Sequence, residues 1–166
     1  MENGSITGFA LIGMGPGKVE SMTLEAVEVA KNADIRLYEA YTALWPEDEL
    51  SKLEELIGPI ERIMRPTVER PEELFERAKT QSIAILVVGD PMQATTHIDF
   101  QLRAQKAGLP VRVIHGISVT TLVPGSTGLS DYKFGRSTTL TYPYGDWIVT
   151  SPVSYTHLTL PTTLGV

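Results

Sequence analysis

Short apolar segments alternate along the chain with longer segments in which apolar residues recur at helical spacing. The short segments are rich in β-branched residues and predict strands over residues 9–12, 35–38, 60–64, 83–88 and 111–114. Residues 83–88 are apolar at every position, which is typical of a parallel strand that is covered on both faces. We expect the rest of the chain to be arranged around this strand.

The segments between these strands predict helices. The expected helices cover residues 48–57, 71–80 and 96–107, together with a first helix that starts at Ser21 or Thr23 and ends near Asn32. Strands that alternate with helices imply right-handed crossover connections between parallel strands. We therefore expect an α/β fold with a doubly wound, five-stranded and mainly parallel sheet.

The residue composition of the sequence changes after the fifth predicted strand. Residues 123–135 are rich in turn-forming residues, and a segment of β-type composition begins soon after them. We expect one N-terminal α/β domain over residues 1–135 and only the start of a second α/β domain over residues 136–152. The string VSYTHLTLPTT at 153–163 resembles the translation of a sequencing-library adapter, so residues 153–166 are expected to be a non-native tail.

Composition narrows the classes of function. The chain has 14 basic and 20 acidic residues, for a formal net charge of −6, and lacks the basic stripe that nucleic-acid binding requires. It has no cysteine, which fits a reducing cytoplasm, and its three histidines are scattered, so no metal site is expected. The N-terminus lacks the pattern of a signal peptide, and no apolar run is long enough to span a membrane.

Candidate binding residues follow three of the predicted strands. Gly13 and Gly15 follow the first strand, Asp90 follows the strand at 83–88, and Ser118 and Val119 follow the fifth. In open α/β sheets, ligands bind just beyond the carboxyl ends of the strands. These residues are therefore expected to line one ligand site.

The glycine loop does not match a standard phosphate-binding motif. A dinucleotide fingerprint needs a third glycine where Lys18 stands, and Pro16 removes a backbone donor. A Walker loop would need glycine at position 12 and serine or threonine at position 19, where isoleucine and valine stand. Glu39 stands at the end of the second strand, where dinucleotide-binding proteins have a ribose-binding acid. A nicotinamide-binding site is therefore not excluded. A tight turn without a ligand explains the loop equally well.

The acidic and imidazole side chains near the strand ends also have two interpretations each. Asp90 is either a ligand contact, which the apolar strand before it favours, or a residue that starts a turn before proline. His97, in a first helical turn, is either a neutral hydrogen-bonding group of the site or a structural residue. His115 is either a ligand contact or a buried imidazole bonded to backbone.

Five motifs together add a family resemblance. They are GMGPG at 13–17, LYEAYT at 37–42, GDPMQATTHID at 89–99, RVIHGIS at 112–118 and GLSDYKFG at 128–135. Over residues 9–144 the chain resembles the tetrapyrrole-methylase-like (class III) methyltransferases, and ATTH with YKFG resembles their archaeal and eukaryotic diphthamide branch. The resemblance implies two α/β domains, homodimers, and S-adenosylmethionine held between the domains. The cofactor contacts that it implies are Gly15, Pro16, Asp90, Gln93, Ser118 and Val119.

The reaction that the resemblance implies is methylation of the amino group on a modified histidine of translation elongation factor 2. The sulfonium of the cofactor supplies the activation, so the protein chiefly has to align amine, methyl group and sulfur. The sequence offers no nucleophile–base pair, and no catalytic residue is assigned from it. A corrin or siroheme-type tetrapyrrole methylase and a non-catalytic nucleotide-binding α/β module remain as alternatives.

Overall fold

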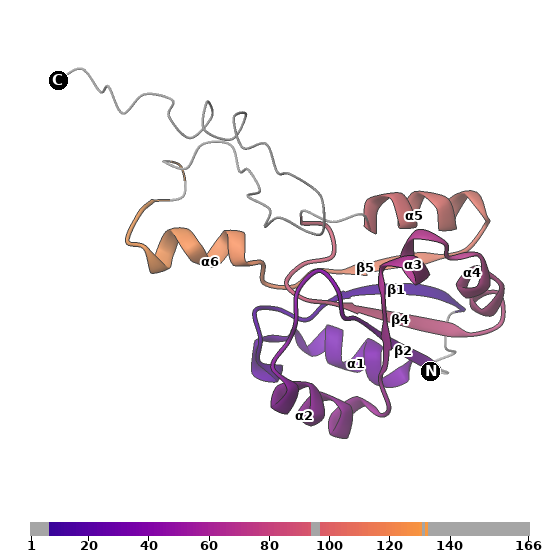
Figure 1. Ribbon diagram of the computed structural model, residues 1–166, viewed down its shortest axis with the longest axis horizontal. Helices are drawn as coiled ribbons and strands as arrows, with labels where there is room; N and C mark the ends of the chain where they lie inside the picture. Colours follow the sequence, from indigo (N-terminus) through magenta and orange to yellow (C-terminus); the bar gives the residue numbers. More distant parts are fainter. Residues whose placement is uncertain (1–6, 94–96, 131, 133–166) are drawn as a thin grey trace, which may run out of the picture. The chain divides into compact units, whose positions relative to one another are not determined.

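A five-stranded sheet forms the centre of the fold (Figure 1). The computed structural model describes residues 7–93, 97–130 and 132. The sheet has the order β3-β2-β4-β1-β5, and each neighbouring pair of strands is parallel. The predicted fold class is therefore confirmed. The strands are β1 (Gly8–Gly13), β2 (Ile35–Glu39), β3 (Glu61–Ile63), β4 (Ser82–Val87) and β5 (Val111–Ile114).

Helices cover both faces of this sheet (Figure 1). One face packs against α1 (Leu24–Asn32) and α2 (Glu47–Ile57). The other packs against α3 (Arg65–Glu69), α4 (Glu72–Ala78) and α5 (His97–Lys106).

Neighbouring residues on the central strands belong to opposite layers of the core. Leu11 and Ile85 lie in the cluster under α3, α4 and α5, whereas Ile12 and Leu86 lie in the cluster under α1 and α2. All four side chains are fully buried. Successive side chains of a strand point to opposite faces, so a strand between two helical layers must be apolar at every position. This explains the unbroken apolar run that the sequence shows.

The structure decides which of two residues starts the first helix. Thr23 is the N-cap of α1, since its hydroxyl accepts a hydrogen bond from the Ala26 amide at 3.0 Å. Ser21 instead lies in the short 3₁₀ turn η1 (Val19–Ser21). Among the described residues, two α-helices were not predicted: α3, which has only five residues, and α6 (Val119–Ser126), which contains Pro124. Short length and an internal proline both hide a helical period.

The contacts within the chain divide it into two units, residues 1–122 and 123–166, and the division falls within α6. The sheet, helices α1 to α5 and the loops at the sheet's edges belong to the first unit. The predicted domain boundary near Gly135, the expected second-domain segment 136–152 and the expected non-native tail 153–166 lie outside the described residues.

Candidate functional site

The strand order places the ends of β4, β1 and β5 side by side, because β1 pairs with β4 on one side and with β5 on the other. The loops that follow these strands carry Gly15, Asp90 and Ser118. All three strands run in the same direction, so these loops leave the sheet at the same edge. The structure thus brings together the residues that the sequence places after three separate strands.

Three glycines pack backbone against backbone at this edge. A Cβ atom on Gly13 would lie 2.4 Å from the Gly116 nitrogen and 2.7 Å from the Gly89 oxygen, and one on Gly116 would lie 2.2 Å from the Gly89 oxygen. These distances leave no room for a side chain. Gly13, Gly89 and Gly116, which we call the glycine junction, therefore bring the three loops as close together as backbones can come.

The first and second loops are also joined by two hydrogen bonds. The Gly15 amide donates to the Gly89 oxygen at 3.1 Å, and the Gly89 amide donates to the Gly15 oxygen at 2.9 Å. Both residues have positive φ, +74° for Gly15 and +75° for Gly89, a conformation that favours glycine. This pairing fixes the turn that carries Pro16, whose side chain is exposed.

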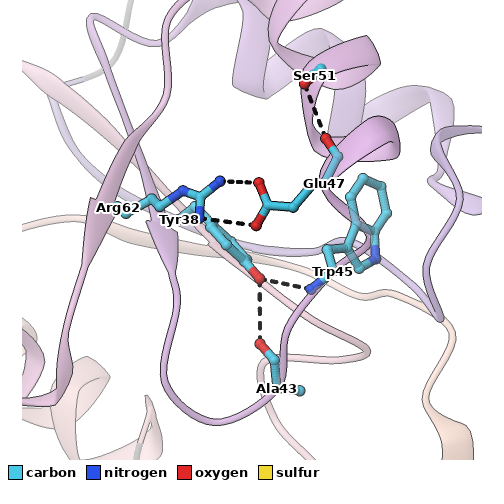
Figure 2. Close-up of polar contacts among 6 residues, drawn as sticks. All are labelled: Tyr38, Ala43, Trp45, Glu47, Ser51 and Arg62. Atoms are coloured by element: carbon cyan, nitrogen blue, oxygen red, sulfur yellow. Dashed lines mark hydrogen bonds and ion pairs between the residues drawn. The ribbon is translucent and has the colours of Figure 1, made fainter.

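The connection between β2 and α2 supports the glycine loop from outside the junction. Figure 2 shows the hydroxyl of Tyr38 between the Trp45 amide, which donates to it at 2.8 Å, and the Ala43 oxygen, to which it donates at 3.4 Å. The buried indole of Trp45 donates its Nε1–H to the Gly15 oxygen at 3.4 Å. Arg62 on β3 forms a bidentate ion pair with the carboxylate of Glu47 at the start of α2 (Figure 2).

Asp90 connects the loops after β4 and β5 through its carboxylate. Its Oδ1 accepts a hydrogen bond from the Met92 amide at 2.7 Å, and its Oδ2 lies 3.2 Å from the Gly116 amide and 2.9 Å from Nδ1 of His115. The Asp90 side chain is 8% exposed, whereas that of His115 is 71% exposed. His115 is therefore not the buried imidazole that one interpretation expected, and its bond is to a carboxylate rather than to backbone.

The remaining predicted contacts lie beside Asp90 or after β5. Gln93 is exposed, and its backbone amide donates to the backbone carbonyl oxygen of Asp90 at 3.1 Å. Ser118 is buried, and its Oγ accepts from the Thr120 amide at 3.3 Å and from the Thr120 hydroxyl at 2.9 Å. Val119, the first residue of α6, is exposed. Pro16, Gln93 and Val119 are thus exposed, whereas Gly15, Asp90 and Ser118 are buried.

Glu39 and His97 form a second carboxylate–imidazole pair, and this one is buried. His97 Nε2 lies 2.6 Å from Glu39 Oε2, and both side chains are 1% exposed. Burial raises the pKa of Glu39, but hydrogen bonds from His97 and Thr42 and the charge of His97 outweigh it, so that the pKa is lowered. A carboxylate held this way in the core is not accessible to a ribose, which favours the structural interpretation of His97.

A cavity of about 480 Å³ lies at the opposite edge of the sheet. Its lining includes the first residues of β1, β4 and β5, namely Gly8, Ser82 and Val111. Arg112 and Glu25, which also line it, form an ion pair at 2.6 Å. None of the predicted site residues lines this cavity, and it is separated from them by the length of the strands.

Metal binding and membrane insertion each require a recognisable arrangement of residues. In the parts of the chain that the structure describes, no group of three or more His, Asp or Glu side chains is placed to hold a metal ion. Within the same residues, no helix is both long and apolar enough to cross a membrane.

Comparisons with known proteins agree with one another. The family model described as "Tetrapyrrole (Corrin/Porphyrin) Methylases" matches residues 8–158. A diphthine synthase of Methanosarcina mazei is 38% identical over 134 residues, which are 80% of this chain and 50% of that protein. One of Methanocella arvoryzae is 37% identical over 144 residues, 85% of this chain and 56% of that protein.

A solved structure gives the same result. The crystal structure of a diphthine synthase aligns with a TM-score of 0.70 at 37% identity, covering 76% of this chain and 51% of that one. The chain spans about half the length of the curated relatives that it matches.

Proposed function

The chain belongs to the tetrapyrrole (corrin/porphyrin) methylase family, and we propose that it is the cofactor-binding part of a diphthine synthase. The family resemblance drawn from the motifs is thereby confirmed. The proposed reaction moves a methyl group from S-adenosylmethionine to the amino group on a modified histidine of translation elongation factor 2. The proposal includes a homodimer of the full-length protein in the cytoplasm, without nucleic acid. Family membership alone does not assign this activity, substrate and partner, because the chain spans about half the length of its relatives.

The glycine junction is the observation that carries the proposal. Three loops meet without intervening side chains at the edge where ligands of open α/β sheets bind, so one ligand could contact all three. The carboxylate of Asp90 is held at this edge by the Met92 and Gly116 amides and lies 2.9 Å from Nδ1 of His115. These features fit a cofactor with several donors and acceptors. The proposed contacts are Gly15, Pro16, Asp90, Gln93, Ser118 and Val119.

The bound cofactor would supply an activated methyl group on a positively charged sulfur. The contribution of this chain is to hold that group in one orientation and to keep water from its reacting side. Alignment of reacting groups can lower a barrier by several kcal/mol without a strong base. The rigid frame around Gly15 and Asp90 suits this task, because each of its loops is tied to a neighbouring loop.

Calorimetry with S-adenosylhomocysteine, the product form of the cofactor, tests the binding part of the proposal. We expect the unsubstituted chain to bind it and Asp90→Ala to weaken binding about tenfold or more, which corresponds to about 1.4 kcal/mol. Asp48→Ala removes an exposed carboxylate at the start of α2 and serves as the matched control, with unchanged affinity. Tight binding of NADH with no response to S-adenosylhomocysteine would instead support a dehydrogenase.

A transfer assay tests the substrate part. Radiolabelled S-adenosylmethionine is incubated with the chain and with elongation factor 2 that carries the modified histidine. Label on this factor, and none on the factor with an unmodified histidine, is the expected result. Label on a corrin or porphyrin substrate instead would support the tetrapyrrole methylase alternative.

A further inference from the structure

We propose that His115 is a catalytic acid–base residue of this site and that Asp90 positions its ring. In this proposal Nε2 of His115 contacts the acceptor amine and accepts the proton that the amine loses on methylation. The inference rests on the proposed function, and it assigns a role that neither the motifs nor the family membership gives to this histidine.

The carboxylate of Asp90 has one fixed orientation. The amides of Met92 and Gly116 donate to its two oxygens at 2.7 and 3.2 Å, from the loops after β4 and β5. A carboxylate only accepts hydrogen bonds, so Nδ1 of His115, 2.9 Å away, must carry a hydrogen. In the neutral ring this leaves the lone pair on Nε2, and the ring is held in the tautomer that can accept a proton there.

The exposure of His115 separates this role from a packing role. Its side chain is 71% exposed, although the carboxylate that it contacts is 8% exposed. The other histidine in the described residues, His97, is 1% exposed and already paired with Glu39. His115 also directly precedes the glycine junction residue Gly116 and lies three positions before Ser118, so its ring stands at the edge where the cofactor contacts are proposed.

The chemistry balances without a further reactant. The lone pair of the amine nitrogen forms a bond to the methyl carbon, and the bond from that carbon to sulfur breaks. The electron pair of the broken bond goes to sulfur, so the sulfonium becomes a neutral thioether. The proton leaves the amine for Nε2, and the imidazolium then releases it to water. The neighbouring carboxylate stabilises the imidazolium during this step, as in other carboxylate–histidine pairs.

The test combines a spectroscopic and a kinetic measurement. Nitrogen-15 NMR of the ring in the unsubstituted chain should show the hydrogen on Nδ1 and none on Nε2, and Asp90→Asn should change this tautomer. His115→Ala and His115→Gln should bind S-adenosylhomocysteine within about threefold of the unsubstituted chain, but transfer methyl groups about a hundredfold more slowly. Added imidazole should restore part of the rate of His115→Ala. Asp48→Ala should keep both binding and rate.

Two results would overturn the inference. One is methyl transfer by His115→Ala at the unsubstituted rate, and the other is a ring whose hydrogen lies on Nε2 in the unsubstituted chain. Failure of the proposed function would look different. The unsubstituted chain would then bind no S-adenosylhomocysteine, whatever the tautomer of His115, and the inference would fall with it.

Discussion

Substitution of one junction glycine tests whether the close approach of three loops matters. In Gly116→Ala the new Cβ would lie 2.2 Å from the Gly89 oxygen and 2.8 Å from two backbone atoms of Gly13, whereas ordinary contact begins at 3.4 Å. Every obstructing atom belongs to the backbone, so no side chain can swing aside. The loops after β1, β4 and β5 would have to move apart by about 1 Å.

The expected cost is that of overpacking, about 1–3 kcal/mol of unfolding free energy. Gly116 is not among the glycines with positive φ, so alanine can adopt its backbone conformation and the cost is steric. Urea unfolding measures this cost. Calorimetry with S-adenosylhomocysteine measures the second effect, a loss of affinity, because the loops that carry Asp90 and Ser118 are the ones displaced.

Gly125→Ala is the matched control. Gly125 lies in α6, where a Cβ atom added to it would have no atom within 4 Å, and it is likewise absent from the positive-φ glycines. Alanine there should leave binding unchanged and stabilise the helix by up to about 1 kcal/mol. If Gly116→Ala unfolded at the same urea concentration as the unsubstituted chain and bound the ligand equally well, the reasoning from the glycine junction would be refuted.

The other predictions concern the frame around the site. Glu39→Gln should cost about 3–5 kcal/mol in urea unfolding, because it breaks the buried pair with His97, and a loss below 1 kcal/mol would contradict this. Because the pKa of Glu39 is lowered in the folded protein, its ionised carboxylate contributes fully to the unfolding free energy above pH 4.5, the ordinary pKa. This contribution is lost as the pH falls through the lower pKa of the folded protein. If Glu39→Gln lost stability in acid as steeply as the unsubstituted chain does, this assignment would be contradicted. Tyr38→Phe should cost about 1–3 kcal/mol, since the buried Trp45 amide loses its acceptor; thermal unfolding measures this, and no change would exclude it. Phe100→Ala should cost about 3–5 kcal/mol by urea unfolding, since its ring packs 4.9 Å from another ring; a cost under 1 kcal/mol would be inconsistent with that packing.

The sequence predicts most of the sheet because a strand that is buried on both faces has apolar residues at successive positions. The apolar run at 83–88 and the alternation with helices predict parallel strands, and the structure has them. The order β3-β2-β4-β1-β5 is not encoded in any one segment. Right-handed crossovers limit the possible orders but do not select one, because selection depends on the packing of the whole chain.

In the candidate site, too, some features follow from local sequence and others only from the strand order. Gly15 and Asp90 could be proposed as site residues because glycine and aspartate after a buried strand are local signals. The bond from Asp90 to His115 spans 25 positions and exists only because β4 and β5 both flank β1. For the same reason the sequence left open whether His97 and His115 are buried, and the structure shows opposite answers for the two histidines.

The most direct test of the cofactor site is to map S-adenosylhomocysteine onto the chain by amide NMR. We predict that the largest shifts on titration fall on Gly15, Asp90, Gly116 and Ser118, at the edge where β4, β1 and β5 end. Shifts confined to Gly8, Glu28 and Arg112, which line the cavity at the opposite edge, would contradict it.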